Sequence, residues 1–123
     1  MSIAHINGID VFYLTDGDPH KPAIIFSNSL GTDHSMWDGQ LEELRKDFYL
    51  IRYDTRGHGL TSAPKGPYTI SQLANDVIGL LDHLSIDKAF YCGISMGGLI
   101  GQYLAIHVPQ RIEALVIANT APK

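Results

Sequence analysis

Residues 89–98 read AFYCGISMGG, and this short stretch decides the fold. The apolar run Ala89–Ile94 predicts a strand, and a serine flanked by glycines follows it at once. Residues 96–107 then repeat apolar side chains at helical spacing until Pro109 stops the helix. A strand that turns directly into a helix, with Gly-x-Ser-x-Gly at the turn, predicts a serine held out at the corner.

Two glycines explain how that serine is displayed. A strand that turns abruptly into a helix brings two backbones together, so side chains at Gly93 and Gly97 would clash. We therefore expect Ser95 in a strained conformation at the tip of the turn, with its hydroxyl exposed beside the amino end of the helix. That helix end favours negative charge, and the amide of Met96 is placed to bind the oxyanion formed when Ser95 attacks a carbonyl carbon. An ordinary glycine-rich turn is the alternative interpretation.

The rest of the chain alternates predicted strands with predicted helices. Capping boxes at 35–38 and 69–72 indicate where two of the helices begin. Strands separated by helices predict parallel pairing through right-handed crossovers, and hence a three-layer α/β fold with a mostly parallel sheet in a single domain, 1–123. The expected elements are a hairpin over 3–14, strands over 23–27, 48–54, 89–94 and 113–118, and helices over 35–46, 70–84 and 96–107.

A second loop is a candidate for completing an oxyanion hole. In a parallel sheet the loops that leave the carboxyl ends of the strands share one rim, where ligands bind. The loop Asn-Ser-Leu-Gly, 28–31, leaves the strand 23–27, and the amide of Leu30 is our candidate for the second oxyanion donor. A simple turn into the next helix is the alternative for this loop.

Three further side chains near the rim are candidate pocket residues. His34 is placed to approach a ligand, Trp37 to line an apolar surface and Arg56 to meet a substrate carboxylate. The alternatives are loop polarity for the histidine, core packing for the tryptophan and a solvated loop cation for the arginine. We also expect Asp54 with Arg56 to fix the loop after its strand, and Cys92 to be a small buried apolar residue rather than a nucleophile.

Composition and charge restrict the partners. The chain has 123 residues, with 9 Lys and Arg against 13 Asp and Glu, and a formal net charge of −4. Because no run of basic residues occurs, we expect neither nucleic acid nor an anionic membrane as a partner. The uncharged stretch 89–106 is long enough to mimic a membrane span, but glycines and polar residues interrupt it. A single cysteine and a start without a secretory pattern predict a cytoplasmic location.

No metal and no other cofactor is expected. The histidines are scattered, and none pairs with another at the spacing that metal ligands require. The sequence Gly57-His58-Gly59 lacks the third glycine and the following helix of a dinucleotide-binding fingerprint.

Three segments together resemble one family, the α/β-hydrolases. GISMGG, 93–98, is similar to the nucleophile elbow of that family, and DTRGHGLTS, 54–62, to the segment after its preceding strand. SNSLGTDHSMWD, 27–38, is most similar to the 3-oxoadipate enol-lactonases, in which Asn-Ser-Leu-Gly stands in place of the commoner His-Gly-x-Gly. The resemblance implies a serine hydrolase of small esters or lactones, with enol-lactone hydrolysis in aromatic catabolism as the implied reaction. Another activity, such as that of a general carboxylesterase, and a non-catalytic fragment or binding module are the alternatives.

The acid and base of the family's triad do not follow the serine as they should. The triad runs in the order Ser, Asp or Glu, His, and only Glu113 and His107 follow Ser95. Glu113 begins its strand, and His107 lies roughly 18 Å along the helix from Ser95, whereas a base needs about 3 Å. The chain thus resembles the amino-terminal half of the fold, without the lid and the last strands, and we expect it to be inactive alone. The exposed edge of strand 113–118 predicts a partner, either the complementary carboxy-terminal half or a second copy.

Overall fold

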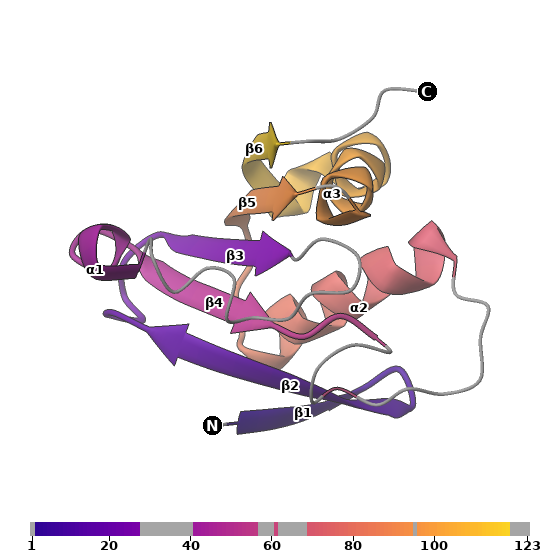
Figure 1. Ribbon diagram of the computed structural model, residues 1–123, viewed down its shortest axis with the longest axis horizontal. Helices are drawn as coiled ribbons and strands as arrows, with labels where there is room; N and C mark the ends of the chain where they lie inside the picture. Colours follow the sequence, from indigo (N-terminus) through magenta and orange to yellow (C-terminus); the bar gives the residue numbers. More distant parts are fainter. Residues whose placement is uncertain (1, 28–40, 57–60, 62–68, 95, 119–123) are drawn as a thin grey trace.

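The computed structural model (Figure 1) contains one six-stranded sheet with helices packed on it. The structure describes residues 2–27, 41–56, 61, 69–94 and 96–118. Its strands are β1 Ser2–Ile6, β2 Ile9–Asp16, β3 Ala23–Ser27, β4 Tyr49–Tyr53, β5 Ala89–Ile94 and β6 Ile112–Ala118. Its helices are α1 Leu41–Leu44, α2 Ile70–His83 and α3 Met96–His107, with a short 3-10 turn η2 at Pro109–Arg111.

The sheet has the strand order β1-β2-β4-β3-β5-β6. The β1–β2 hairpin turns at Asn7 and Gly8, both at positive φ, as an Asn-Gly turn predicts. The hairpin pairs antiparallel with β4, whereas β4, β3, β5 and β6 are mutually parallel. The arrowheads of β3, β4 and β5 therefore point the same way in Figure 1, and their carboxyl ends share one rim. The mostly parallel sheet predicted from the sequence is confirmed.

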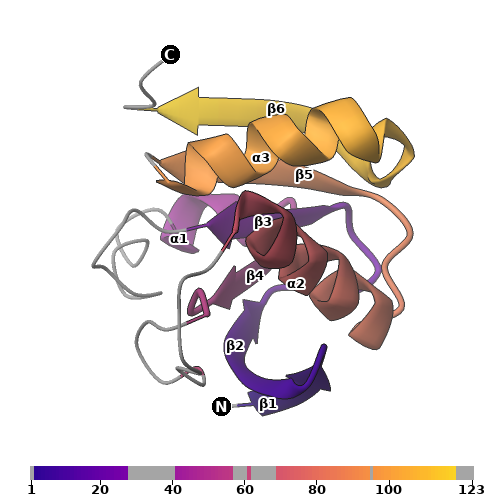
Figure 2. The same cartoon turned by 90° about the vertical axis from the view of Figure 1, so that its right-hand side faces the viewer.

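Helices lie on both faces of this sheet. Figure 2 shows α2 and α3 on one face, with α1 on the opposite side. Because strand side chains alternate between faces, each face has its own apolar cluster. The larger cluster, beneath α2 and α3, includes Ile25, Ile51, Tyr53, Val77, Leu80, Tyr91, Ile100 and Leu104. The smaller, beneath α1, joins Ile24, Phe26 and Leu50 to Leu44, Phe48, Phe90 and Cys92. The predicted three-layer α/β architecture is therefore present.

Local sequence signals set the helix boundaries well. Helix α2 begins with the predicted capping box, in which the Thr69 hydroxyl accepts from the Gln72 amide and the Gln72 side chain accepts from the Thr69 amide, each at 3.0 Å. Of the helix expected over 35–46, the described part is Leu41–Leu44, and residues 35–40 lie outside the described residues. The uncharged stretch 89–106 is divided between β5 and α3, and none of the described helices has the length and apolar character to cross a membrane.

Candidate active site

The corner between β5 and α3 is as tight as the sequence predicts. Strand β5 ends at Ile94 and α3 begins at Met96, so a single residue, Ser95, connects them. A Cβ atom built on Gly93 would lie 2.5 Å from the carbonyl carbon and oxygen of Gly97 and 2.9 Å from the next amide nitrogen. These separations are shorter than real Cβ contacts, and the neighbouring atoms are backbone, which cannot move aside cheaply. The strand and helix backbones therefore meet here.

Met96, the predicted oxyanion donor, lies at the amino end of α3. Met96 is the first residue of the helix and is partly buried. The amide of a first helical residue has no acceptor within the helix, and the helix dipole favours negative charge beside it. The other predicted site residues, Ser95, Leu30, His34 and Trp37, lie outside the described residues, so their roles stay predictions.

Beneath this corner lies a group of buried hydroxyls that the sequence analysis did not predict. We call Ser27, Tyr53 and Tyr91 the hydroxyl cluster; they come from β3, β4 and β5, and none is more than 2% exposed. The hydroxyl oxygens of Ser27 and Tyr53 are 2.7 Å apart, and the Tyr91 hydroxyl donates to the carbonyl oxygen of Gly97 at 2.7 Å. The Ser27–Tyr53 hydrogen bond therefore joins the ends of β3 and β4, and Tyr91 joins β5 to the first turn of α3.

Burial keeps the tyrosines of the hydroxyl cluster protonated. Desolvation raises the pKa of Tyr53 to about 12, the hydrogen bond with Ser27 opposes this rise, and the negative charge of Asp76 adds to it. Desolvation also raises the pKa of Tyr91 well above its ordinary value, with a further contribution from Tyr53. Both side chains remain neutral hydrogen-bond donors at physiological pH.

Arg56 lies in a buried ion pair rather than in solvent. Its Nε and Nη2 atoms donate to the two carboxylate oxygens of Asp76 on α2, at 2.9 and 3.0 Å, and Asn7 donates to the same carboxylate at 3.2 Å. The side chains of Arg56 and Asp76 are 10% and 3% exposed. The alternative interpretation of Arg56 as a solvated loop cation was wrong, because its guanidinium is buried and bound to Asp76. Its role as a pocket residue stays a prediction. The spacing of Asp76 from Leu73 and Leu80, on the buried face of α2, is the sequence signal that would have revealed this partner.

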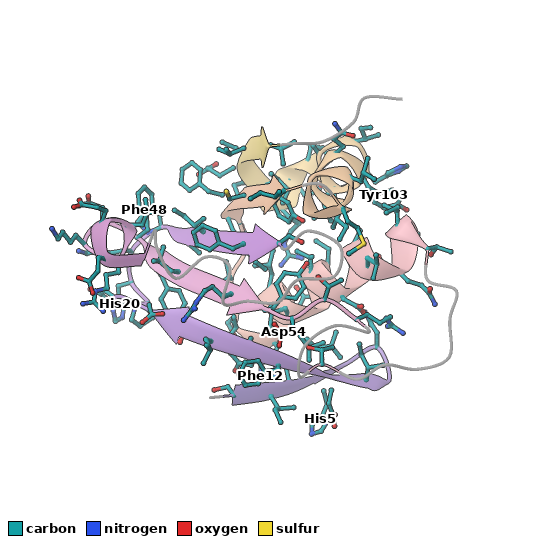
Figure 3. All side chains as sticks on the ribbon, viewed as in Figure 1. His5, Phe12, His20, Phe48, Asp54 and Tyr103 are labelled. Atoms are coloured by element: carbon teal, nitrogen blue, oxygen red, sulfur yellow. The ribbon has the colours of Figure 1, made fainter. Side chains whose placement is uncertain are left out.

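Two further contacts fix the loop that follows β4. The amide of the fully buried Asp54 donates to the carbonyl oxygen of Phe12 at 3.1 Å, and the Phe12 amide donates to the Thr61 hydroxyl at 2.9 Å. Figure 3 labels Asp54 at the end of β4 and Phe12 on β2. The loop is thus attached to β2 through Asp54 and Thr61 and to α2 through Arg56.

The histidine and carboxylate after the serine lie away from the rim. His107 ends α3, where it is exposed and stacks on Tyr103 with ring centroids 4.1 Å apart. Glu113 is exposed near the start of β6 and pairs with Lys88 at 3.6 Å. Cys92 is partly buried, and desolvation raises the pKa of its thiol, which disfavours the nucleophilic thiolate. Within the ranges that the structure describes, no three His, Cys, Asp or Glu side chains gather as a metal site would require.

Comparisons with known proteins agree on one family. The family model for the alpha/beta hydrolase fold matches residues 22–123. Over 111 residues the chain is 58% identical to 3-oxoadipate enol-lactonase 2 of Acinetobacter baylyi. The aligned region covers 90% of this chain and 42% of that protein. It is 45% identical over 108 residues to 3-oxoadipate enol-lactonase 1 of the same organism, covering 88% of this chain and 40% of that protein.

A solved structure shows the same likeness. The crystal structure of the enol-lactonase from Burkholderia xenovorans LB400 superposes with a TM-score of 0.95 at 53% identity, covering 98% of this chain and 47% of that one. The chain thus spans between two-fifths and one-half of the length of these relatives. This coverage is consistent with the amino-terminal half of the fold.

The tight corner predicts a large cost for a side chain at Gly93. In Gly93→Ala the new methyl group would overlap the Gly97 backbone, so we expect the free energy of unfolding to fall by about 2–3 kcal/mol. Ala114→Val, which enlarges an exposed side chain on the neighbouring strand β6, serves as the control and should change stability by less than about 0.5 kcal/mol. Urea unfolding followed by circular dichroism measures both. An unchanged midpoint for Gly93→Ala would contradict the close approach.

The buried ion pair predicts a second effect on stability. Asp76→Ala leaves the Arg56 guanidinium buried without its counter-charge, and we expect a loss of about 3–5 kcal/mol in the same assay. Asp82 lies on the same helix and pairs with Arg111 at 2.8 Å, but its side chain is 63% exposed. Asp82→Ala should therefore cost no more than about 1 kcal/mol. Equal losses from the two variants would refute a special role for Asp76.

Proposed function

Because this chain belongs to the α/β-hydrolase family, we propose that it supplies the nucleophile and the oxyanion hole of a serine hydrolase that acts on small esters or lactones. The observation that carries the proposal is the β5–α3 corner, where the approach of Gly93 to Gly97 leaves one residue, Ser95, between strand and helix. A corner of this kind exposes a serine hydroxyl above the sheet and beside a helix amino end.

In the proposed mechanism the Ser95 hydroxyl attacks the carbonyl carbon while a base takes its proton. The amides of Met96 and Leu30 donate hydrogen bonds to the oxyanion that forms, and each such donor is worth on the order of 10²–10³ in rate. The acyl C–O bond breaks, and the leaving oxygen receives a proton. Water then hydrolyses the acyl-enzyme and regenerates Ser95.

The substrate that we propose is 3-oxoadipate enol-lactone. The support is the 58% and 53% identity to proteins named as enol-lactonases, together with the segment Asn-Ser-Leu-Gly, 28–31, noted in the sequence. Hydrolysis opens the lactone ring by adding water across the acyl bond, and the enol that is released becomes a ketone. A general carboxylesterase would instead prefer simple acyl esters, so the ratio of the two activities separates the alternatives. A cytoplasmic location stays a prediction.

The acid and base are proposed to come from a complementary polypeptide that corresponds to the remaining length of the relatives. His107 and Glu113 lie away from the rim, as their positions on α3 and β6 require. The proposed binding surface is the edge strand β6, with Val116 60% exposed, together with the adjoining apolar cavity of about 280 Å³ beneath α1. Phe26, Phe90 and Val116 help to line that cavity, and burying such a surface favours association.

Reaction with a serine-directed fluorophosphonate tests the nucleophile. We mix the chain with the carboxy-terminal part of the 58%-identical Acinetobacter enol-lactonase and measure intact mass and enol-lactone hydrolysis. The assembly should gain one phosphonyl group and hydrolyse the lactone, whereas Ser95→Ala should lose the label and about 10⁶ in rate. Ser2→Ala, at an exposed serine of β1, is the matched control and should behave as wild type. Labelling that survives Ser95→Ala, or no labelling in any assembly, would exclude Ser95 as the nucleophile.

The binding surface is tested separately by mass and affinity. Val116→Lys places a charge on the proposed interface, so we expect its affinity for the complementary polypeptide to fall by more than about ten-fold. Ile106→Lys alters an apolar side chain that is 73% exposed on α3 and should leave affinity unchanged. Analytical ultracentrifugation gives both results. A dimer of the chain alone that Val116→Lys dissociates would instead assign the surface to a second copy.

A further inference from the structure

We propose that the hydroxyl cluster positions the nucleophile corner, with Tyr91 holding the first turn of α3 against β5 in the register that Ser95 and Met96 require. This inference rests on the proposed function, because it names residues that set the geometry of that site without touching the substrate.

Tyr91 contacts α3 at two successive turns. Its hydroxyl donates to the Gly97 carbonyl oxygen at 2.7 Å, two residues beyond the nucleophile position. Its ring runs beneath Gly101, where an added Cβ would lie 2.7 Å from Cε1 and 2.8 Å from Cδ1 of the ring. A ring wedged under one turn and a hydroxyl bonded to the turn before it fix both the height and the register of α3 on the sheet.

The rest of the hydroxyl cluster connects this contact to the other rim loops. Ser27 is the last residue of β3 and immediately precedes the loop that holds the candidate donor Leu30. Tyr53 is the last residue of β4 and immediately precedes the loop that Arg56 attaches to α2. Hydrogen bonding by Ser27 lowers the pKa of both tyrosines. The ends of β3 and β4 are thereby joined to each other, next to the strand β5 that carries Tyr91.

Their position distinguishes these hydroxyls from ordinary core side chains. Ser27, Tyr53 and Tyr91 lie within the larger core on the face that α2 and α3 cover, among apolar neighbours. Apolar residues of similar shape would fill that space without the cost of desolvating hydroxyls, so stability alone does not call for them. A fully paired buried polar network does, however, select one arrangement of the elements that it joins. The arrangement selected here is the packing of β3, β4 and β5 with the first turn of α3.

The test compares Tyr91→Phe with Tyr103→Phe in amide hydrogen exchange of the chain. Tyr103 lies on the same helix, and its hydroxyl hydrogen-bonds the Ser71 hydroxyl at 3.2 Å, away from the corner. We expect Tyr91→Phe to keep the fold but to exchange the amides of residues 96–101 about ten-fold faster, as the loss of one hydrogen bond predicts. Tyr103→Phe should leave the exchange of these amides unchanged.

Kinetics of the assembly with the complementary polypeptide give the second measurement. Tyr91→Phe should lower kcat about ten-fold with KM unchanged, because a misplaced oxyanion donor weakens binding of the transition state and not of the substrate. Exchange and kcat both within about two-fold of wild type, or an equal loss from Tyr103→Phe, would overturn the inference. If the wild-type assembly does not hydrolyse the lactone, the proposed function fails, and exchange at residues 96–101 still decides the positioning role.

A second variant covers the case in which Tyr91→Phe does not fold. Tyr53→Phe removes a hydroxyl from the cluster and keeps the Tyr91 hydroxyl that donates to the Gly97 carbonyl oxygen. Faster exchange at residues 96–101 in Tyr53→Phe supports transmission through the cluster, and unchanged exchange overturns it.

Discussion

The approach of two backbones at Gly93 is the constraint on which the site depends. A Cβ atom built on Gly93 would lie 2.5 Å from the Gly97 carbonyl group, so the strand and the helix leave no room for a side chain there. A single residue, Ser95, connects the two elements. The same approach brings the amino end of α3, with its unpaired amides, to the carboxyl end of β5. The proposed nucleophile position and the proposed anion-stabilising position therefore both depend on one packing contact, and a change to that contact is expected to affect both.

Buried polar side chains near the carboxyl ends of the strands help to hold the adjoining segments in place. Parallel strands bring their carboxyl ends together, but the loops that leave them are long and would adopt many arrangements without further contacts. Here the start of the loop after β4 is attached to α2 through Arg56 and Asp76, the ends of β3 and β4 are joined through Ser27 and Tyr53, and Tyr91 joins β5 to α3. Buried polar contacts have a desolvation cost, and in return they favour one packing of the strands and helices that they connect.

Features that depend on adjacent residues could be predicted from the sequence. Contacts between residues far apart in the chain could not. Adjacent residues determine the capping box at Thr69, the strand Ala89–Ile94 and the close approach of Gly93 to Gly97. The structure contains all three where the sequence predicts them. Arg56 was misread because its partner is twenty positions away, and a cation seen alone in a loop gives no sign of burial. The Ser27–Tyr53 contact, which spans 26 positions, was missed for the same reason. Pairing across strands depends on sheet order, which only the fold supplies.

Oxyanion stabilisation and proton transfer differ in what they require of a chain. Main-chain donors at a helix end form as soon as the helix and its preceding strand pack, so the proposed oxyanion donor at the start of α3 needs only β5 and α3. A base and its acid are side chains that must arrive from elsewhere in the fold to within about 3 Å of the nucleophile. The two contributions are separable in serine hydrolases, where about 10³–10⁴ in rate over water survives the loss of the triad. In the function proposed for this chain, Gly93 and Tyr91 set the position of the main-chain donors, and the proposed partner has one task, which is to bring a base to Ser95.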